Sequence, residues 1–225
     1  MTLPLPPKPK SLTPSGSFYG DDGRWSTFEV NIAGDGEGQG QNFNVLISTS
    51  SSVTLVPAQT GWCSTDDCAK SRGIMSTING QQALGLDAQP PAWDKTGLYA
   101  LPFADLKWWS PELLLLNRND TLNGEWGLTT VGLGAASKQS DTIPDQYVAM
   151  YYFEDLFLGS LGLSVGTVGP NGAQKPTFFS SLAAQVGIIP SQSYGYTAGA
   201  AYRKSDLDVR FQSYFMLFIQ SSIQG

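Results

Sequence analysis

The sequence has no histidine, only two cysteines and few charged residues. Without histidine, the chain cannot build a Ser/His/Asp or Cys/His nucleophilic centre, and it lacks the commonest transition-metal ligand. Two cysteines are too few for a cysteine-rich zinc site. The catalytic chemistries that remain are a pair of carboxylates and a Ser/Lys arrangement, for which no motif is visible. We therefore expect no cofactor and no metal ion.

Charge is scarce and mostly negative. Charged residues make up 14% of the chain, and the net charge is −6. A chain of this kind is repelled by the phosphates of nucleic acids. Long hydrophobic runs are also missing, because the run Tyr214–Ile219 is far too short to span a bilayer. We therefore expect neither a nucleic-acid partner nor a membrane span.

Turn-forming residues, in contrast, are plentiful. The 225 residues include 25 glycines and 14 prolines, and 41% of them are hydrophobic. A chain of this length can form one large β domain or two small ones. Many turn formers with little charge are typical of short strands joined by tight turns.

Local patterns place some of the expected elements. Residues Phe28–Ile32 alternate apolar and polar side chains, and the Gly-rich turn Gly34–Gln41 follows, so we predict a hairpin. Residues Phe178–Val186 form the best short helix, since Gly187 comes directly after it. The segment Tyr194–Tyr202 is rich in β-formers. Regular structure is expected to begin near residue 17.

The two cysteines are close together in the chain. Cys63 and Cys68 could pair, bind a metal ion or stay reduced. Because the chain offers no other soft ligand, we favour a structural disulfide, which implies an oxidising compartment. Asn119 begins a glycosylation sequon and agrees with that location. We therefore expect a secreted protein or one in the secretory pathway.

The first residues do not show a signal peptide. Met1–Lys10 is interrupted by prolines and has no continuous apolar segment. Three explanations stay open: the chain starts after a removed signal with an added methionine, a first exon is missing from the gene model, or the protein stays inside the cell. We favour them in that order.

The most informative segment is Val45–Pro57. An apolar strand leads into the turn Ser48-Thr49-Ser50, and a second β-rich strand follows. This order resembles the loop by which aspartic peptidases present a catalytic aspartate in an Asp-Thr-Gly or Asp-Ser-Gly triplet. In that comparison, Ser48 stands at the aspartate and Ser50 at the glycine.

Further segments resemble pepsin-like aspartic peptidases (peptidase family A1), especially their fungal branch, in the family's order. They are the strand pair Ser17–Ile32, the short loop Cys63–Cys68, the strand Trp126–Gly134 after the flap, the core segment Leu158–Leu163 and the helix with its exit, Pro176–Ile189. The resemblance covers roughly residues 17–203. Within it, Thr129 replaces an aspartate that the family often carries.

The resemblance implies an all-β fold: the pepsin-like acid protease fold, present as a single N-terminal lobe with a flap hairpin and one or two short helices. Residues 1–16 would form a flexible Pro-rich arm, residues 17–203 the lobe and residues 204–225 a divergent C-terminal tail. The first flap strand would be Gly97–Leu101. The aromatic candidates for the cleft and flap are Tyr99, Trp108, Trp109 and Trp126. For Trp108 and Trp109, ordinary packing is the simpler interpretation.

The resemblance also predicts a loss of catalysis. In aspartic peptidases two aspartates, one from each lobe, share a proton and act on one water. Ser48 cannot ionise, no Asp-Thr-Gly or Asp-Ser-Gly triplet exists in the sequence, and we expect no second lobe in it. We therefore predict no catalytic residue.

Three functions are compatible with these observations. The first is a pseudo-peptidase that binds a peptide, protein or glycan in the cleft. The second is a truncated or decayed gene product without its own function, whose exposed lobe face would favour self-association. The third, which the residues disfavour, is an active acid aspartic endopeptidase.

Overall fold

The computed structural model describes residues 10–12, 14–19, 25–33, 40–58, 63, 65–75, 94–101, 122–135, 141–152, 156–170, 173–185, 189–197 and 214–217. This part of the chain is mostly β, with two short helices, α1 (Asp66–Ser71) and α4 (Phe178–Ala184). The expected β-rich class is therefore confirmed. The strands are β1 (Lys10–Leu12), β2 (Pro14–Tyr19), β3 (Trp25–Ile32), β4 (Gln41–Ser48), β5 (Thr54–Pro57), β6 (Asp94–Leu101), β7 (Leu122–Leu133), β8 (Thr142–Tyr151), β9 (Ser160–Gly162), β10 (Thr167–Val168), β11 (Lys175–Pro176), β12 (Gly195–Thr197) and β13 (Tyr214–Leu217).

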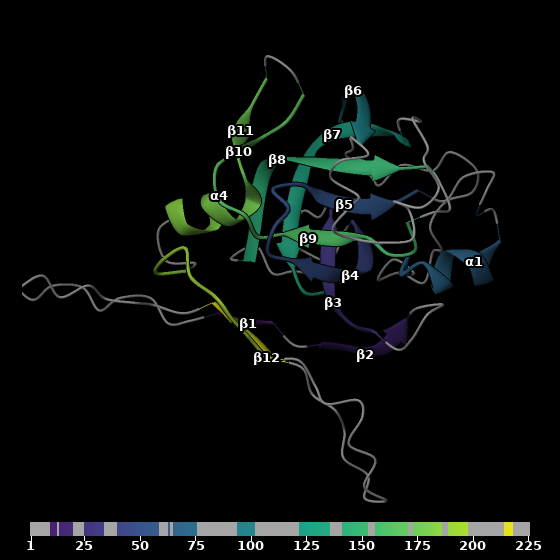
Figure 1. Ribbon diagram of the computed structural model, residues 1–225, viewed down its shortest axis with the longest axis horizontal. Helices are drawn as coiled ribbons and strands as arrows, with labels where there is room; N and C mark the ends of the chain where they lie inside the picture. The colour runs from purple at the N-terminus through teal and green to yellow at the C-terminus, as the bar shows by residue number, and fades with distance from the viewer. Residues whose placement is uncertain are drawn as a thin grey trace, which may run out of the picture.

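The main sheet closes on itself. It has eight strands in the order β2-β3-β4-β9-β5-β8-β7-β6, and β7 also pairs with β3 (Figure 1). The six strands from β3 to β7 in that order therefore form a ring of pairings, a small barrel. Strand β7 makes closure possible by changing partners along one edge. Its first part pairs with β6, and after an irregularity between Thr129 and Val131, its end pairs with β3.

The barrel mixes antiparallel and parallel pairs. β3 and β4 form the predicted antiparallel hairpin, with Val30 opposite Phe43. β4 pairs in parallel with β9, and β5 in parallel with β8. β9 therefore lies between β4 and β5, two strands that follow one another in the chain.

Two hydrophobic clusters lie on the two sides of the barrel wall. Neighbouring residues Leu55 and Val56 of β5 fall into different clusters, because successive side chains of a strand point to opposite faces. The larger cluster receives a fully buried residue from each of the six barrel strands, so it fills the barrel interior. These residues are Val30, Val45, Leu161, Val56, Val148 and Val131. The smaller cluster, with Trp126 and Tyr151, lies on the outer side of β5, β7 and β8.

Helix α4 adds to the interior core. Its residues Phe178, Phe179 and Leu182 are buried in the larger cluster. The side chain of Thr177 caps its N-terminus and accepts a hydrogen bond from the Ser180 N–H at 3.3 Å. The helix starts where the sequence predicted. Its predicted end at Val186 was wrong, because Gln185 already has an extended backbone.

A separate three-stranded sheet joins segments from both ends of the chain. β13 lies between β1 and β12, and Lys10 is opposite Leu217 (Figure 1). The Lys10 side chain also forms an ion pair with Asp141, directly before β8. The expectation that regular structure begins near residue 17 was wrong. Strands lie inside the segment expected to be a flexible arm: β1 pairs with β13, which is distant in the sequence, and β2 pairs with β3, the strand that follows it. The boundaries at residues 16 and 203 stay predictions.

The outer face of β3 and β4 is polar although it is covered. Asn31 and Asn44 are each 1% exposed. The Asn31 side chain donates to Oδ1 of Asn42 at 2.7 Å, and the Asn44 side chain donates to the Tyr19 hydroxyl of β2 at 2.6 Å. Glu29 lies on the same face, opposite Asn44. Burial raises the pKa of Glu29, and a hydrogen bond with the backbone of Ala135 lowers it to a smaller extent.

The raised pKa of Glu29 makes a prediction about pH. The folded state holds the Glu29 proton more tightly than the unfolded state, so ionisation disfavours folding as the pH rises. This cost is absent below the unfolded pKa and is complete above the folded one. We expect Glu29→Gln, which stays neutral, to gain stability relative to wild type between about pH 4 and about pH 7. Urea unfolding at both pH values measures the change.

Asp145→Asn, at an exposed position, is the matched control. The prediction is wrong if the difference in the free energy of unfolding between Glu29→Gln and wild type is the same at both pH values.

Candidate functional site

The candidate site is the loop between β4 and β5. Ser48 ends β4 and is 6% exposed. Its Oγ accepts a hydrogen bond from the Ser51 N–H at 3.2 Å. The Ser51 hydroxyl donates to the carbonyl of Val53 at 3.0 Å, and it also accepts from the N–H of Val53 at 3.1 Å. The serines therefore stabilise the turn through their own backbone, as serine often does in turns.

This loop is fixed to β9 and to the residues that follow β9. Leu163 N–H donates to the carbonyl of Ser48 at 2.8 Å, and Ser164 N–H donates to the carbonyl of Ser51 at 3.0 Å. Gly162, the last residue of β9, donates to Thr54 Oγ1 at 3.4 Å. The loop is therefore held on the side of β9 by three hydrogen bonds. These contacts hold the backbone of the loop directly against β9, the strand that lies between β4 and β5.

The close approach at Gly162 leaves no room for a side chain. A Cβ there would lie 2.6 Å from the carbonyl oxygen of Val53 and 2.9 Å from that of Ser51. Both oxygens belong to backbone, which cannot rotate away. The sequence segment Leu161-Gly162-Leu163 is therefore matched to the Ser48 loop: the two leucines fill the barrel interior, and the glycine lets the loop approach.

The chemistry available at this loop is that of hydroxyl groups. Thr49 and Ser50 are exposed, whereas Ser48 is buried. Every hydrogen bond of Ser48 in the described part of the chain is made with backbone, so no described carboxylate or amine activates its hydroxyl. A hydroxyl group neither ionises at accessible pH nor attacks a substrate without a base.

Thr129, the other position with a lost acid in the family comparison, lies in β7 opposite Gln146 of β8. Both side chains are 5% exposed. Neither Thr129 Oγ1 nor Gln146 Oε1 has a hydrogen-bond partner among the described residues. These positions carry polar groups in a buried wall of the barrel, and neither is ionisable.

The structure describes two of the four predicted aromatic residues and does not describe the predicted glycosylation site. Trp126 is 7% exposed and packs edge-to-face on Tyr147, with ring centroids 6.1 Å apart, in the outer cluster. Tyr99 lies in β6, opposite Gly124 of β7. Trp108, Trp109 and Asn119 lie outside the described residues. The cleft and flap roles of the four aromatic residues and the glycosylation of Asn119 stay predictions.

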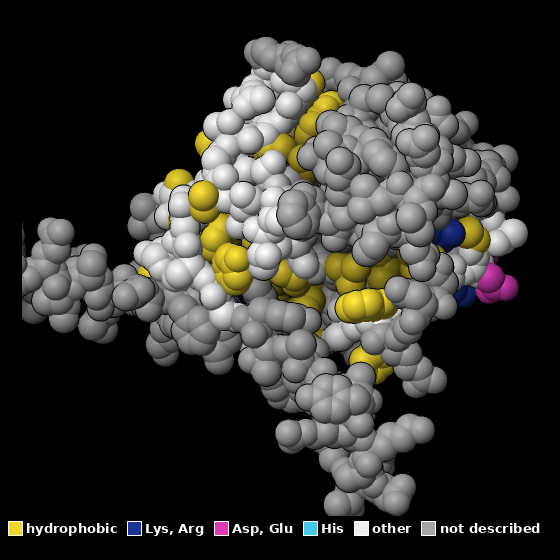
Figure 2. Space-filling model, in the orientation of Figure 1, with side chains coloured by type: hydrophobic (Ala, Val, Ile, Leu, Met, Phe, Trp, Pro, Cys, Tyr) yellow, Lys and Arg dark blue, Asp and Glu magenta, His cyan; other side chains and the backbone are white. Residues whose placement is uncertain are grey.

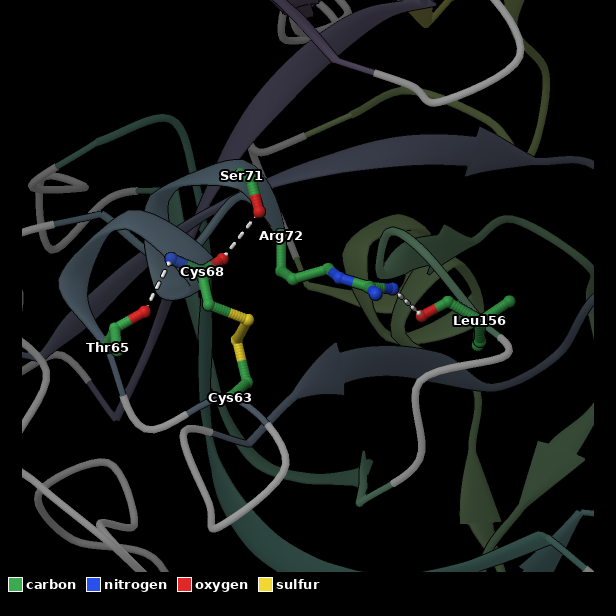
Figure 3. The surroundings of a disulfide bond; sticks show 6 residues. All are labelled: Cys63, Thr65, Cys68, Ser71, Arg72 and Leu156. Carbon is green, nitrogen blue, oxygen red and sulfur yellow. Dashed lines mark hydrogen bonds between the residues drawn. A yellow bond between two sulfur atoms is a disulfide. The ribbon is translucent and has the colours of Figure 1, made fainter.

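A disulfide joins Cys63 and Cys68 at the start of α1, with the two Cα atoms 5.3 Å apart (Figure 3). At the other end of this helix, Arg72 donates from Nη1 to the carbonyl of Leu156 at 3.2 Å. Its guanidinium also lies 4.4 Å from the centre of the Phe157 ring. Burial raises the pKa of the Tyr151 phenol, and the charge of Arg72 acts in the opposite direction.

Sequence reasoning did not find Arg72. No local pattern marks an arginine that contacts residues more than 80 positions further along the chain.

The visible face of the molecule has little described charge away from one edge (Figure 2). In the view of Figure 2, the described Lys, Arg, Asp and Glu side chains gather at one edge, on the side where Figure 1 places α1. Among the described residues, no group of three or more His, Cys, Asp and Glu side chains could hold a metal ion. No helix in the described ranges is long and apolar enough to cross a membrane.

Comparison with protein-family models finds no matching family, and comparison with curated proteins finds no matching relative. The resemblance to pepsin-like peptidases therefore depends on the quoted segments alone.

The packing of Gly162 can be tested directly. We expect Gly162→Ala to lower the free energy of unfolding by about 1–3 kcal/mol, because the added methyl group overlaps two backbone oxygens. Urea unfolding measures the loss. The matched control is Ser164→Ala, two residues further on at a half-buried position, which adds no atom. Equal stability of the two variants would show that the loop moves away from β9 without cost.

Proposed function

We propose that this chain is a non-catalytic binding domain, built like the N-terminal lobe of a pepsin-like aspartic peptidase, and that it binds extended peptides at the Ser48 loop without cleaving them. The observation that carries the proposal is the hydrogen bonding of Ser48. A buried serine, bonded to the backbone of its own turn, stands where the resembling family has its catalytic carboxylate.

The lobe assignment has support from topology as well as from sequence order. The loop that contains Ser48 joins two strands that enclose β9, and β9 belongs to the segment that resembles the family's core segment. The expected flap would be the antiparallel pair β6–β7. The disulfide supports a secreted or secretory-pathway location, since such bonds persist in oxidising compartments.

Loss of catalysis follows from the chemistry of the loop. General acid–base catalysis by one positioned group contributes on the order of 10²–10⁴-fold to a rate. Ser48 cannot supply this contribution, because its hydroxyl does not ionise and has only backbone partners among the described residues. The chain also has no histidine that could activate the serine as a nucleophile.

Peptide binding has support from the surface next to Ser48. Thr49 and Ser50 are exposed, and the hydrogen bond from Ser164 to the carbonyl of Ser51 brings Val165, which is 54% exposed, close to the same loop. Hydroxyl groups beside an apolar side chain can bond the polar backbone of a peptide and contact its side chains. Protein and glycan ligands, which the sequence left open, are alternatives at the same surface.

The test uses the full chain with its disulfide intact and a pool of internally quenched random decapeptides, between about pH 3 and 6, where acid peptidases work. We expect no cleavage by wild type or by Ser48→Ala, and saturable binding of the same peptides measured by fluorescence anisotropy. Val165→Asp should weaken this binding. The matched control is Phe18→Asp, which introduces the same charge at another exposed apolar position, 45% exposed, in β2.

Three outcomes would contradict the proposal. Cleavage that is lost in Ser48→Ala would make the protein an active peptidase that needs this serine. Absence of binding by the folded wild type would favour a product without its own function or a ligand other than peptide. Equal binding by Val165→Asp and Phe18→Asp would place the binding surface away from the Ser48 loop.

A further inference from the structure

Cys68 is connected to its surroundings through its side chain, its N–H and its carbonyl. Its sulfur forms the disulfide with Cys63, and its N–H donates to Oγ1 of Thr65 at 3.2 Å (Figure 3). Its carbonyl accepts from the Ser71 hydroxyl at 2.7 Å and from the Arg72 N–H at 3.1 Å. The backbone of Arg72 is therefore bonded directly to the residue that carries the disulfide.

Helix α1 has little else to hold it in place. It spans six residues, and Ala69 is its buried residue. Isolated helices of this length are unstable in water, so α1 depends on the attachments at its two ends. At the start, these are the disulfide and the Thr65 cap. At the end, they are Arg72 and the backbone pairing of Ile74 with Phe43 of β4.

Arg72 connects this helix to the segment that leads into β9. Its side chain binds the Leu156 carbonyl and covers the Phe157 ring. Three residues later, Gly159 accepts a hydrogen bond from Leu46 at 2.9 Å and packs on the carbonyl of Leu55 so closely that a Cβ would lie 2.4 Å away. The same segment continues through β9 to Leu163, which donates to Ser48. One continuous set of contacts therefore runs from Cys68 through Arg72 to the Ser48 loop.

We propose that the Cys63–Cys68 disulfide is a redox-sensitive switch: a thiol reductant opens it, Arg72 leaves the segment Leu156–Phe157, and the contacts between β9 and the Ser48 loop loosen. The proposal concerns the local stability of this loop and holds whether or not the loop binds peptides.

The exposures of the two cysteines fit such a reaction. Cys68 is partly exposed, and Cys63 is 1% exposed. The thiolate of a dithiol reductant attacks the sulfur of Cys68, forms a mixed disulfide there, and displaces the thiolate of Cys63, which takes up a proton. The second thiol of the reductant then attacks the mixed disulfide and releases Cys68 as a thiol. The protein gains two electrons and two protons, and the reductant becomes a cyclic disulfide.

The measurement is amide hydrogen exchange, resolved by residue, on the full chain with and without dithiothreitol. We expect reduction to speed the exchange of the Leu163 and Ser164 amides, which bond the Ser48 loop, by about tenfold or more. The amides of Val30 and Phe43 in the β3–β4 hairpin should keep their rates. The double variant Cys63→Ser/Cys68→Ser should show the same fast exchange without reductant.

The role of Arg72 has its own test. Arg72→Met keeps an unbranched side chain and removes the guanidinium, so in the oxidised protein it should speed Leu163 exchange as reduction does. Reduction of this variant should then add little. Lys70→Met is the matched control, since it removes a positive charge from an exposed position of the same helix. It should leave the exchange of Leu163 unchanged.

Several results would overturn the switch. Reduction that leaves the Leu163 and Ser164 amides unchanged would show that the disulfide is not connected to the loop. An equal increase at Val30 and Phe43 would show a disulfide that stabilises the whole fold. Additive effects of reduction and Arg72→Met would show that the connection does not run through Arg72. If Arg72→Met does not fold, the hydrogen exchange of the reduced wild type and of the double cysteine variant still decides whether the disulfide controls the stability of the Ser48 loop.

Discussion

The barrel depends on the insertion of β9 between β4 and β5. Two strands that are consecutive in the chain would ordinarily pair with each other. Here they are separated by a strand that enters more than 100 residues later, and each bonds to a different edge of it. The connection between β4 and β5 must therefore pass around the end of β9. That need explains why the loop is rich in hydroxyl side chains that bond their own backbone, and why Gly162 beneath it has no room for a side chain.

The same insertion divides the molecule into an interior and an outer layer. Leu161 of β9 is fully buried among the side chains from the other barrel strands, while Ser160 beside it, also fully buried, faces the opposite side of the wall. The outer layer receives Trp126, Tyr147 and Tyr151, large residues whose polar atoms limit where they can pack. A strand of three residues thus belongs to both layers and connects the candidate site to the core. A change at Leu161 would affect both.

Sequence patterns predicted the features that depend on neighbours in the chain. The alternation of Phe28–Ile32 with a following glycine-rich turn predicted the β3–β4 hairpin, and the local pattern predicted the start of the helix at Phe178 but not its end. The pairing of Cys63 and Cys68, which we favoured because the chain offers no other soft ligand, is also the one that the structure shows. Each of these features is formed by residues that are near neighbours in the sequence, so local patterns can indicate it.

The features that sequence patterns did not predict are long-range. β9 has three residues, too few for a periodic signal, and its role comes from the strands on both sides. The contacts of Arg72 join segments that are 84 positions apart in the sequence, so no local pattern indicated them. The position of Ser48 in the loop was visible from the sequence, but its hydrogen bond to Ser51 depends on the path that the turn takes around β9.

The sheet formed by β1, β12 and β13 sets an order of events for biosynthesis. Lys10 and Leu217 lie more than 200 positions apart in the sequence, yet they are partners in one strand pair. Strand β1 must therefore remain without this partner until β13 has been synthesised, and closing so long a segment of chain is slow. Until then, an unpaired strand edge is open to other chains. The yield of folded protein therefore depends on how well the nascent chain is kept apart from other chains before β13 arrives.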